Sequence, residues 1–179
     1  MSSNPKSAPG SRSAARLNAV QALYEMEMSG AGSDSVIQEF MSNRWANAPI
    51  LDDPDEDDAF DDEGNYNPVE AQVVEMAEPD QAFFQELVNG ISSNRADLDG
   101  LITPHLAKEW PMDRLESVLR AILRCGAYEL NSVIETPARV VINEYVEVTK
   151  AFFDGKEPGL VNGLLDNLAH QVRTTEFKD

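Results

Sequence analysis

The sequence predicts an all-α fold, and three observations support that prediction. Apolar residues recur at spacings of three and four along most of the chain, which is the pattern of one buried helix face. No two segments show the alternation of apolar and polar residues that is typical of paired strands. The 179 residues suit one ordinary domain or two small ones, with enough length to bury a core. We therefore expect an all-helical bundle.

The first two parts of the chain are predicted from composition and from helix signals. Residues 1–10 are rich in Ser, Pro and Gly and are predicted to form a disordered N-terminal arm. Residues 11–47 are predicted to form an N-terminal helical part, with one helix that ends at Gly30 and Gly32 and a short second helix. The acid-free start also resembles an organellar transit peptide. Because the helix beginning near Ser11 continues into the core-like "NAVQALYEMEM", we favour a start that belongs to the fold.

Charge is distributed very unevenly along the chain. The net charge is −18, and residues 48–80 hold 13 Asp and Glu with no Lys or Arg, which leaves about −5 for the remainder. The first 24 residues contain Lys6, Arg12 and Arg16 and no acid. This asymmetry is typical of a basic arm combined with an acidic segment.

Residues 48–79 are predicted to form a disordered acidic insertion. Nine of the twelve residues from Asp52 to Glu63 are Asp or Glu. Such a segment cannot bury enough apolar surface to offset the entropy of ordering it. We interpret it as an insertion or a linker.

Residues 80–173 are predicted to form the C-terminal helical part of the same domain. One helix runs from Asp80 through Ile91, a shorter one lies around residues 98–102, and a long helix with a wide apolar face spans residues 112–130. The next segment, "TPARVVINEYVEVTKAFF", contains valines and isoleucine that favour a strand. A start signal, with Thr136 as N-cap and Pro137 as first helical residue, favours a helix instead.

The four residues "LVNG" occur twice, at residues 87–90 and 160–163. Asn-Gly is a strong hairpin signal between strands, but here the neighbouring apolar spacing is helical. Glycine within a helix costs about 1 kcal/mol relative to alanine, so each copy needs a reason. We expect Gly163 to allow close approach of another helix, and we expect a packing role for Gly90.

The lack of a recognisable targeting segment and the single cysteine predict a cytoplasmic protein. The sequence contains no long apolar run that would form a secretory or transmembrane segment. The single cysteine, Cys125, lies on an apolar helix face and is predicted to be a buried hydrophobic residue, which fits a reducing compartment.

Sequence signals for a metal, a cofactor or catalysis are missing. His105 and His170 are far apart and have no partners at metal-ligand spacing. The run "RADLDGL" resembles a calcium loop, but with Gly100 at position 6 the two required acids are replaced by Arg95 and Leu106. No phosphate-binding glycine loop or serine elbow is present. We therefore expect neither an enzyme nor a resident cofactor.

Several of these segments together resemble one family. "NAVQALYEM", "FFQELVNGISSNRADLDGLI", "LRAILRCGAYEL" and "TPARVVINEYVEVTKAFFDGKEPGLVNGLLDNLA" are similar to the transcription antitermination factor NusB family. The resemblance covers about residues 12–172, apart from the acidic insertion at roughly 46–79. It implies a NusB-like bundle of about seven helices in two packed subdomains, without catalysis.

The resemblance also implies partners. It implies a heterodimer with the ribosomal protein NusE that reads boxA-type single-stranded RNA. This heterodimer is expected to act on the RNA polymerase elongation complex with other Nus factors in ribosomal RNA operons. A helical protein-binding adaptor without RNA binding is the alternative.

The acidic insertion has two interpretations. It is either a solubilising linker or a set of carboxylates that competes with RNA phosphate at low salt.

Site residues follow from the resemblance, residue by residue. Tyr24 is expected on the partner surface, with core packing as the alternative. The chain departs from the family pattern at Leu119, where an acidic residue is common, and at Leu160, where an aromatic residue is common. The residues expected to contact RNA are Lys6, Arg12, Arg16, Lys156 and Asn162.

Overall fold

The computed structural model describes residues 10–44 and 78–178. Within these ranges the chain forms seven α-helices and no strand, which confirms the prediction of an all-helical bundle of about seven helices. The predicted disordered arm, with Lys6, lies outside the described residues except for Gly10. Most of the acidic insertion, residues 48–77, also lies outside them.

The first three helices and a short π-helical turn pack together, and we call them the N-terminal subdomain. This grouping places residues 81–93 with the first helices, whereas the sequence analysis placed them in the C-terminal part. Gly30 ends the first helix as expected, because its backbone adopts the left-handed conformation (φ 72°) and its N–H donates to the carbonyl of Met26. The Asp80 side chain caps the third helix by accepting a hydrogen bond from the N–H of Phe83. The elements are α1 (Ser11–Ser29), α2 (Ser33–Glu39), the π-helical turn η1 (Phe40–Arg44) and α3 (Gln81–Ser93).

The other four helices and two short 3₁₀ turns form the C-terminal subdomain. Residues 95–100, which resembled a calcium loop in sequence, lie within a helix. The elements are α4 (Arg95–Ile102), η3 (Thr103–His105), η4 (Met112–Arg114), α5 (Ser117–Ser132), α6 (Ala138–Phe152) and α7 (Glu157–Val172).

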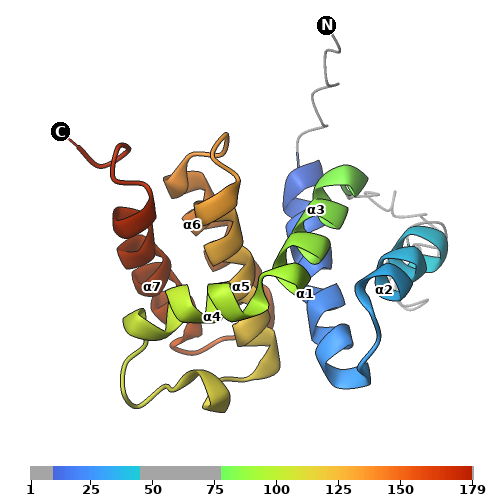
Figure 1. Ribbon diagram of the computed structural model, residues 1–179, viewed down its shortest axis with the longest axis horizontal. Coiled ribbons are helices and arrows are strands. Elements are labelled where there is room, and N and C mark those ends of the chain that lie inside the picture. Colours follow the sequence, from blue (N-terminus) through green and yellow to red (C-terminus); the bar gives the residue numbers. More distant parts are fainter. Residues whose placement is uncertain (1–9, 45–77, 179) are drawn as a thin grey trace, which may run out of the picture.

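Helix α5 is the centre of the bundle. It packs against α1 and α3 of the N-terminal subdomain and against α4, α6 and α7 of its own subdomain. In Figure 1, α6 and α7 lie on one side, α1, α2 and α3 lie on the other, and α4 crosses between them. Burial of nearly the whole circumference of α5 explains its wide apolar face. The largest fully buried side chains include Leu119, Ile122, Leu123 and Leu130 of α5, Leu87 of α3, Tyr145 of α6 and Leu165 of α7.

The residues after α7 fasten the end of α5 to the start of α6. The buried guanidinium of Arg173 donates hydrogen bonds to the carbonyls of Glu129 and Val133, at 3.1 and 2.7 Å. It therefore adds donors to carbonyl groups at the end of α5, of which that of Glu129 also accepts the backbone N–H of Val133 at 3.0 Å. Arg173 also pairs with Glu176, whose other carboxylate oxygen accepts the N–H of Ala138 at 2.8 Å.

The start of α6 differs from the sequence prediction. The helix begins at Ala138, so Pro137 holds the N-cap position and Thr136 lies one residue outside it. No side chain of the N-cap residue caps this helix, and the distant carboxylate of Glu176 performs that role. The hydrogen bond from Ala138 and the nearby charge of Arg173 lower the pKa of Glu176.

Of the two predictions made for glycines within helices, the one for Gly90 is confirmed and the one for Gly163 is wrong. Gly90 packs as expected, because a Cβ atom there would lie 2.3 Å from the ring of Tyr128. The prediction of close helix approach at Gly163 is wrong, since a Cβ atom there meets no described atom within 4 Å. The close approach to α7 occurs at Gly126 of α5 instead, where a Cβ atom would lie 2.7 Å from the side chain of Leu165.

We expect opposite effects from two alanine substitutions. Gly126→Ala should lower the free energy of unfolding by about 1–3 kcal/mol, because the fully buried Leu165 has no space into which to move. Gly163→Ala should raise it by up to about 1 kcal/mol, because alanine is the better helix former at an open position. Urea unfolding of both variants measures the difference. A destabilising Gly163→Ala would contradict this account of the two glycines.

Candidate nucleic-acid interface

Arg16 lies in the interior between the two subdomains. Its side chain is 4% exposed and donates two hydrogen bonds to the carboxylate of Glu129 on α5, at 2.9 and 2.8 Å. Its remaining terminal nitrogen lies 3.5 Å from a carboxylate oxygen of Glu144 on α6. A phosphate would reach this guanidinium only after the pair had separated. The structure therefore gives Arg16 a structural role, in place of the RNA contact that we expected from the sequence.

The surroundings of this pair are buried and strongly polarised. Burial opposes the charge of Arg16, but the hydrogen bond and charge of Glu129 outweigh it, so the pKa of Arg16 is raised. Burial, together with the charge of Glu129, raises the pKa of the Tyr145 hydroxyl and of the Cys125 thiol. Arg16 therefore stays charged, and the Tyr145 hydroxyl and the Cys125 thiol stay protonated at neutral pH.

Arg12 lies one helical turn before Arg16 and remains accessible. Its side chain is 41% exposed, and its Nε atom lies 3.9 Å from a carboxylate oxygen of Asp80. Its Cζ atom lies 4.5 Å from the ring centroid of Phe83, and the Cζ atom of Arg16 lies 5.2 Å from the same centroid. The ring of Phe83 thus packs against both guanidinium groups, and only the exposed Arg12 can turn its guanidinium toward a phosphate.

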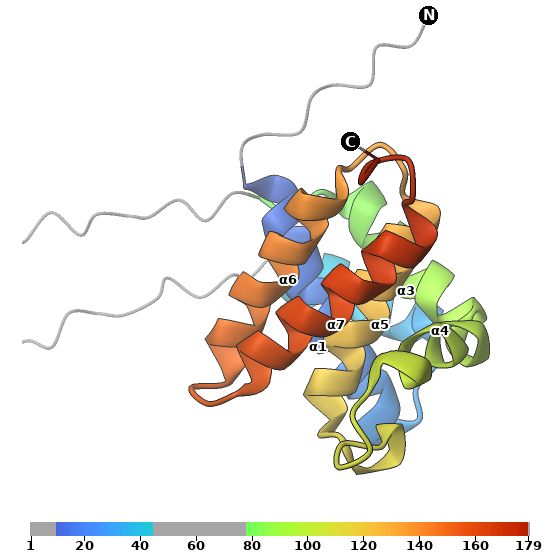
Figure 2. The ribbon, with the colours of Figure 1, turned by 90° about the vertical axis from the view of Figure 1, so that its left-hand side faces the viewer.

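Lys156 and Asn162 lie at the other end of α6. Lys156 is the N-cap residue of α7, Asn162 follows within its second turn, and both are exposed. The first turns of α1 lie beside the first turns of α6, whereas the turn from α6 to α7 lies at the far end of α6 (Figure 2). The 15 residues of α6 span about 22 Å at 1.5 Å per residue. The structure therefore separates these two residues from Arg12 along the length of α6.

The expected partner surface lies on the second half of α1. Tyr24 is 38% exposed, so its placement agrees with a surface role better than with core packing. Leu119 is buried and presents nothing to a partner, whereas Leu160 is half-buried on the first turn of α7.

Other types of site are not apparent in residues 10–44 and 78–178. No three His, Cys, Asp or Glu side chains in these ranges gather as they would around a metal ion. None of the helices there combines the length and the apolar character that a membrane crossing requires.

Comparisons with known proteins identify the family. A model described as "NusB family" matches residues 13–170. The chain is 44% identical to the transcription antitermination protein NusB of Rhodopseudomonas palustris (strain BisB18), over 93% of this chain and 85% of that protein. It is also 44% identical to the protein of the same name from Caulobacter vibrioides, over 90% and 94% of the two chains. The chain belongs to the NusB family.

Solved structures agree with the NusB fold. A structure of T. maritima NusB matches with a TM-score of 0.65 and 25% sequence identity, over 93% of this chain and 96% of that one. A structure of the antitermination factors NusB and NusE in complex with dsRNA matches with a TM-score of 0.62 and 21% identity, over 89% and 96%. At that identity the second match supports the fold alone.

Sequence reasoning missed two buried residues that contact the arginines of α1 in this NusB-family chain. Glu129, the partner of Arg16, is an acid within the otherwise apolar run "GAYEL", and an acid on a buried helix face signals a buried partner of opposite charge. Phe83, whose ring packs against the guanidinium groups of Arg12 and Arg16, lies on the apolar face of α3 and is 2% exposed. Its contact with two arginines 67 and 71 positions earlier has no local sequence signal.

The burial of Cys125 leads to a prediction for this NusB-family chain. The thiol is fully buried and its pKa is raised, so a thiol reagent should react only when the core opens. We expect modification by a disulfide reagent at pH 8 to be slower than that of free cysteine by about a thousandfold or more. Addition of urea above the unfolding midpoint should restore the fast rate. A fast reaction of the folded protein would contradict this description of the core.

Proposed function

We propose that this NusB-family protein is a transcription antitermination factor that pairs with NusE and binds boxA-type single-stranded RNA. In this role it acts with other Nus factors on the RNA polymerase elongation complex that transcribes ribosomal RNA operons, and it catalyses no reaction. The observation that supports the proposal most directly is 44% identity, over 93% of the chain, to a protein named for transcription antitermination.

The proposed RNA contacts form two patches. Arg12 supplies positive charge at the start of α1, and Lys156 supplies it at the start of α7. Lys6, which precedes α1 in the sequence and lies outside the described residues, is proposed to add to the first patch. Arginine and lysine contact phosphates and fix the position of the strand. The exposed amide of Asn162 is suited to hydrogen bonding with the edge of an unstacked base. A single strand that follows α6 would contact both patches.

The proposed partner contact is Tyr24 on the second half of α1. A half-exposed tyrosine combines a large apolar ring with a hydroxyl group, which is a frequent combination at protein interfaces. Two observations favour the alternative of a protein-binding adaptor without RNA: the net charge of −18 and the burial of Arg16. Both reduce the positive charge that could attract RNA. A measurement of RNA binding therefore decides between the two functions.

We expect RNA affinity to depend on the two patches separately. Arg12→Gln and Lys156→Gln should each weaken binding of a boxA-type oligonucleotide, in the presence of NusE, and each should reduce the slope of log affinity against log salt by roughly 1. Lys108→Gln, at another exposed lysine, is the matched control and should leave the slope unchanged. Fluorescence anisotropy over a salt series measures all three variants. No measurable RNA binding by the parent protein with NusE would reject the RNA-binding function in favour of the adaptor.

A further inference from the structure

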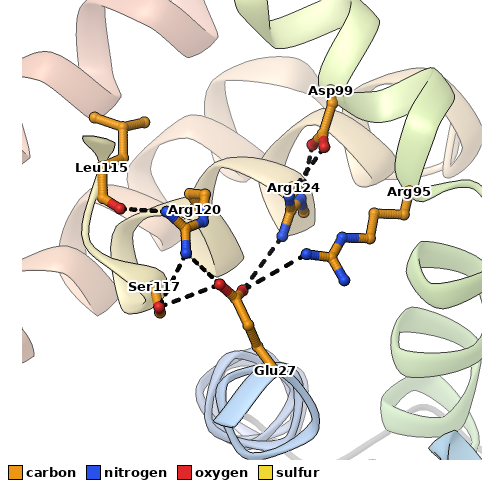
Figure 3. Close-up of polar contacts among 7 residues, drawn as sticks. All are labelled: Glu27, Arg95, Asp99, Leu115, Ser117, Arg120 and Arg124. Carbon is orange, nitrogen blue, oxygen red and sulfur yellow. Dashed lines mark hydrogen bonds and ion pairs between the residues drawn. The ribbon is translucent and has the colours of Figure 1, made fainter. Parts of the chain in front are cut away.

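A second cluster of charged side chains lies between the end of α1 and helices α4 and α5 (Figure 3). Glu27 on α1 accepts a hydrogen bond from Arg120 of α5. The other carboxylate oxygen of Glu27 lies 3.6 Å from Nη1 of Arg124 and 3.9 Å from Nη2 of Arg95. Arg124 also pairs with Asp99 of α4. We call these five residues the Glu27 cluster.

Charge in the Glu27 cluster is unbalanced, with three guanidinium groups and two carboxylates. Burial opposes the charge of Glu27, but the hydrogen bond and charge of Arg120 outweigh it and lower the pKa of Glu27, so this carboxylate is charged at neutral pH. One further carboxylate would bring the cluster to three charges of each sign. In a chain whose full sequence has a net charge of −18, this is a local excess of positive charge.

Two of the arginines have donors without a hydrogen bond. Arg124 donates from Nε and Nη2 to Asp99, at 2.7 and 2.9 Å, and its Nη1 stays beyond hydrogen-bond distance from Glu27. Arg95 makes only the 3.9 Å ion pair among the described residues, and its side chain is 56% exposed. A planar guanidinium with free donors is well suited to a carboxylate.

A pocket of about 300 Å³ opens beside these donors. Its most buried lining residues are Ile91 of α3 and Ala121 of α5, and the lining also includes Leu23 and Met26 of α1. Arg95 and Arg124 belong to the same lining. Its size lies at the lower end of the range for ligand pockets, and it combines an apolar interior with a few convergent polar groups.

We propose that this pocket binds a segment of a partner polypeptide in which a large apolar side chain is followed by a carboxylate. The apolar side chain lies against Ile91 and Ala121, and the carboxylate bridges Arg95 and Nη1 of Arg124. The site goes beyond the proposed function, because it uses neither the RNA patches nor Tyr24. Charge complementarity selects an acidic occupant over a neutral or basic one.

The lining favours a polypeptide over a nucleic acid. None of the described residues that line the pocket is aromatic, so these residues offer no stacking platform for a base. Its aliphatic and thioether side chains suit an aliphatic anchor, and methionine adapts readily to the shape of a bound group. The carboxylates of Glu27 and Asp99 would repel the several phosphates of a strand, whereas a single carboxylate balances the cluster.

Two peptides of equal size test the proposal. Acetyl-Leu-Glu-amide and acetyl-Leu-Gln-amide differ only in the charge of one side chain. Each is titrated into the full chain while the methyl resonances of Met26 and Ile91 are followed by NMR. We expect saturable changes at both methyl groups, and about tenfold tighter binding of the glutamate peptide, as for a hydrogen bond between charged groups.

A variant separates the arginine contact from general charge. Arg95→Met should remove the preference for the glutamate peptide while the fold is kept, because Arg95 is exposed and Glu27 retains Arg120 and Arg124. Arg139→Met, the same change on an exposed residue of α6 outside the pocket, should keep the preference. Equal affinities of the parent for the two peptides, or no saturable change at Met26 and Ile91, would overturn the proposal. Displacement of the glutamate peptide by a single-stranded oligonucleotide would also overturn it, in favour of a nucleic-acid site.

Discussion

Arg16 and Glu129 form an ion pair in an interior that excludes water, and this pair joins α1 of the N-terminal subdomain to α5 at the centre of the bundle. Burial of two charges is costly unless the geometry is good and the hydrogen bonds are complete. The geometry is good here, since the contact with Glu129 is bidentate and the third guanidinium nitrogen makes an ion pair with Glu144 at 3.5 Å. Any other position of α1 along α5 would leave one of these charges unpaired, so the pair specifies how the subdomains fit together.

The placement of the exposed residues follows from that constraint. Because Arg16 points inward, Arg12 one turn earlier lies over Phe83 and beside Asp80, where a phosphate can reach it. At the other end of α1 the Glu27 cluster makes a second contact with α5, so α1 is held by charged groups near both ends. The hydrogen bonds of Arg173 with the end of α5 and of Glu176 with the start of α6 fix the junction between these two helices in a similar way. Burial of the apolar core between these contacts stabilises the fold, and the charged contacts fix the position of α1 along α5.

Local signals in the sequence were sufficient for most of the helices and for several individual residues. Spacing of apolar residues predicted the helices, because a buried face imposes its period directly on the sequence. Gly30 as a helix stop and Cys125 as a core residue were also predicted, since each depends on near neighbours. The burial of Arg16 could not be predicted in this way, because its partner lies 113 positions away. The cap of α6 by Glu176 and the open space around Gly163 depend likewise on tertiary contacts, which no local pattern records.

The central claim is that Arg16 and Glu129 act as a unit, and a double-mutant cycle tests it most directly. The free energy of unfolding in urea is measured for the parent, Arg16→Met, Glu129→Met and the double variant. Each single change leaves a buried charge alone and should cost about 3–5 kcal/mol, whereas the double change leaves none and should cost much less than the sum. The account predicts a coupling energy of at least about 2 kcal/mol. Additive losses, with the double variant as unstable as the two singles combined, would contradict it.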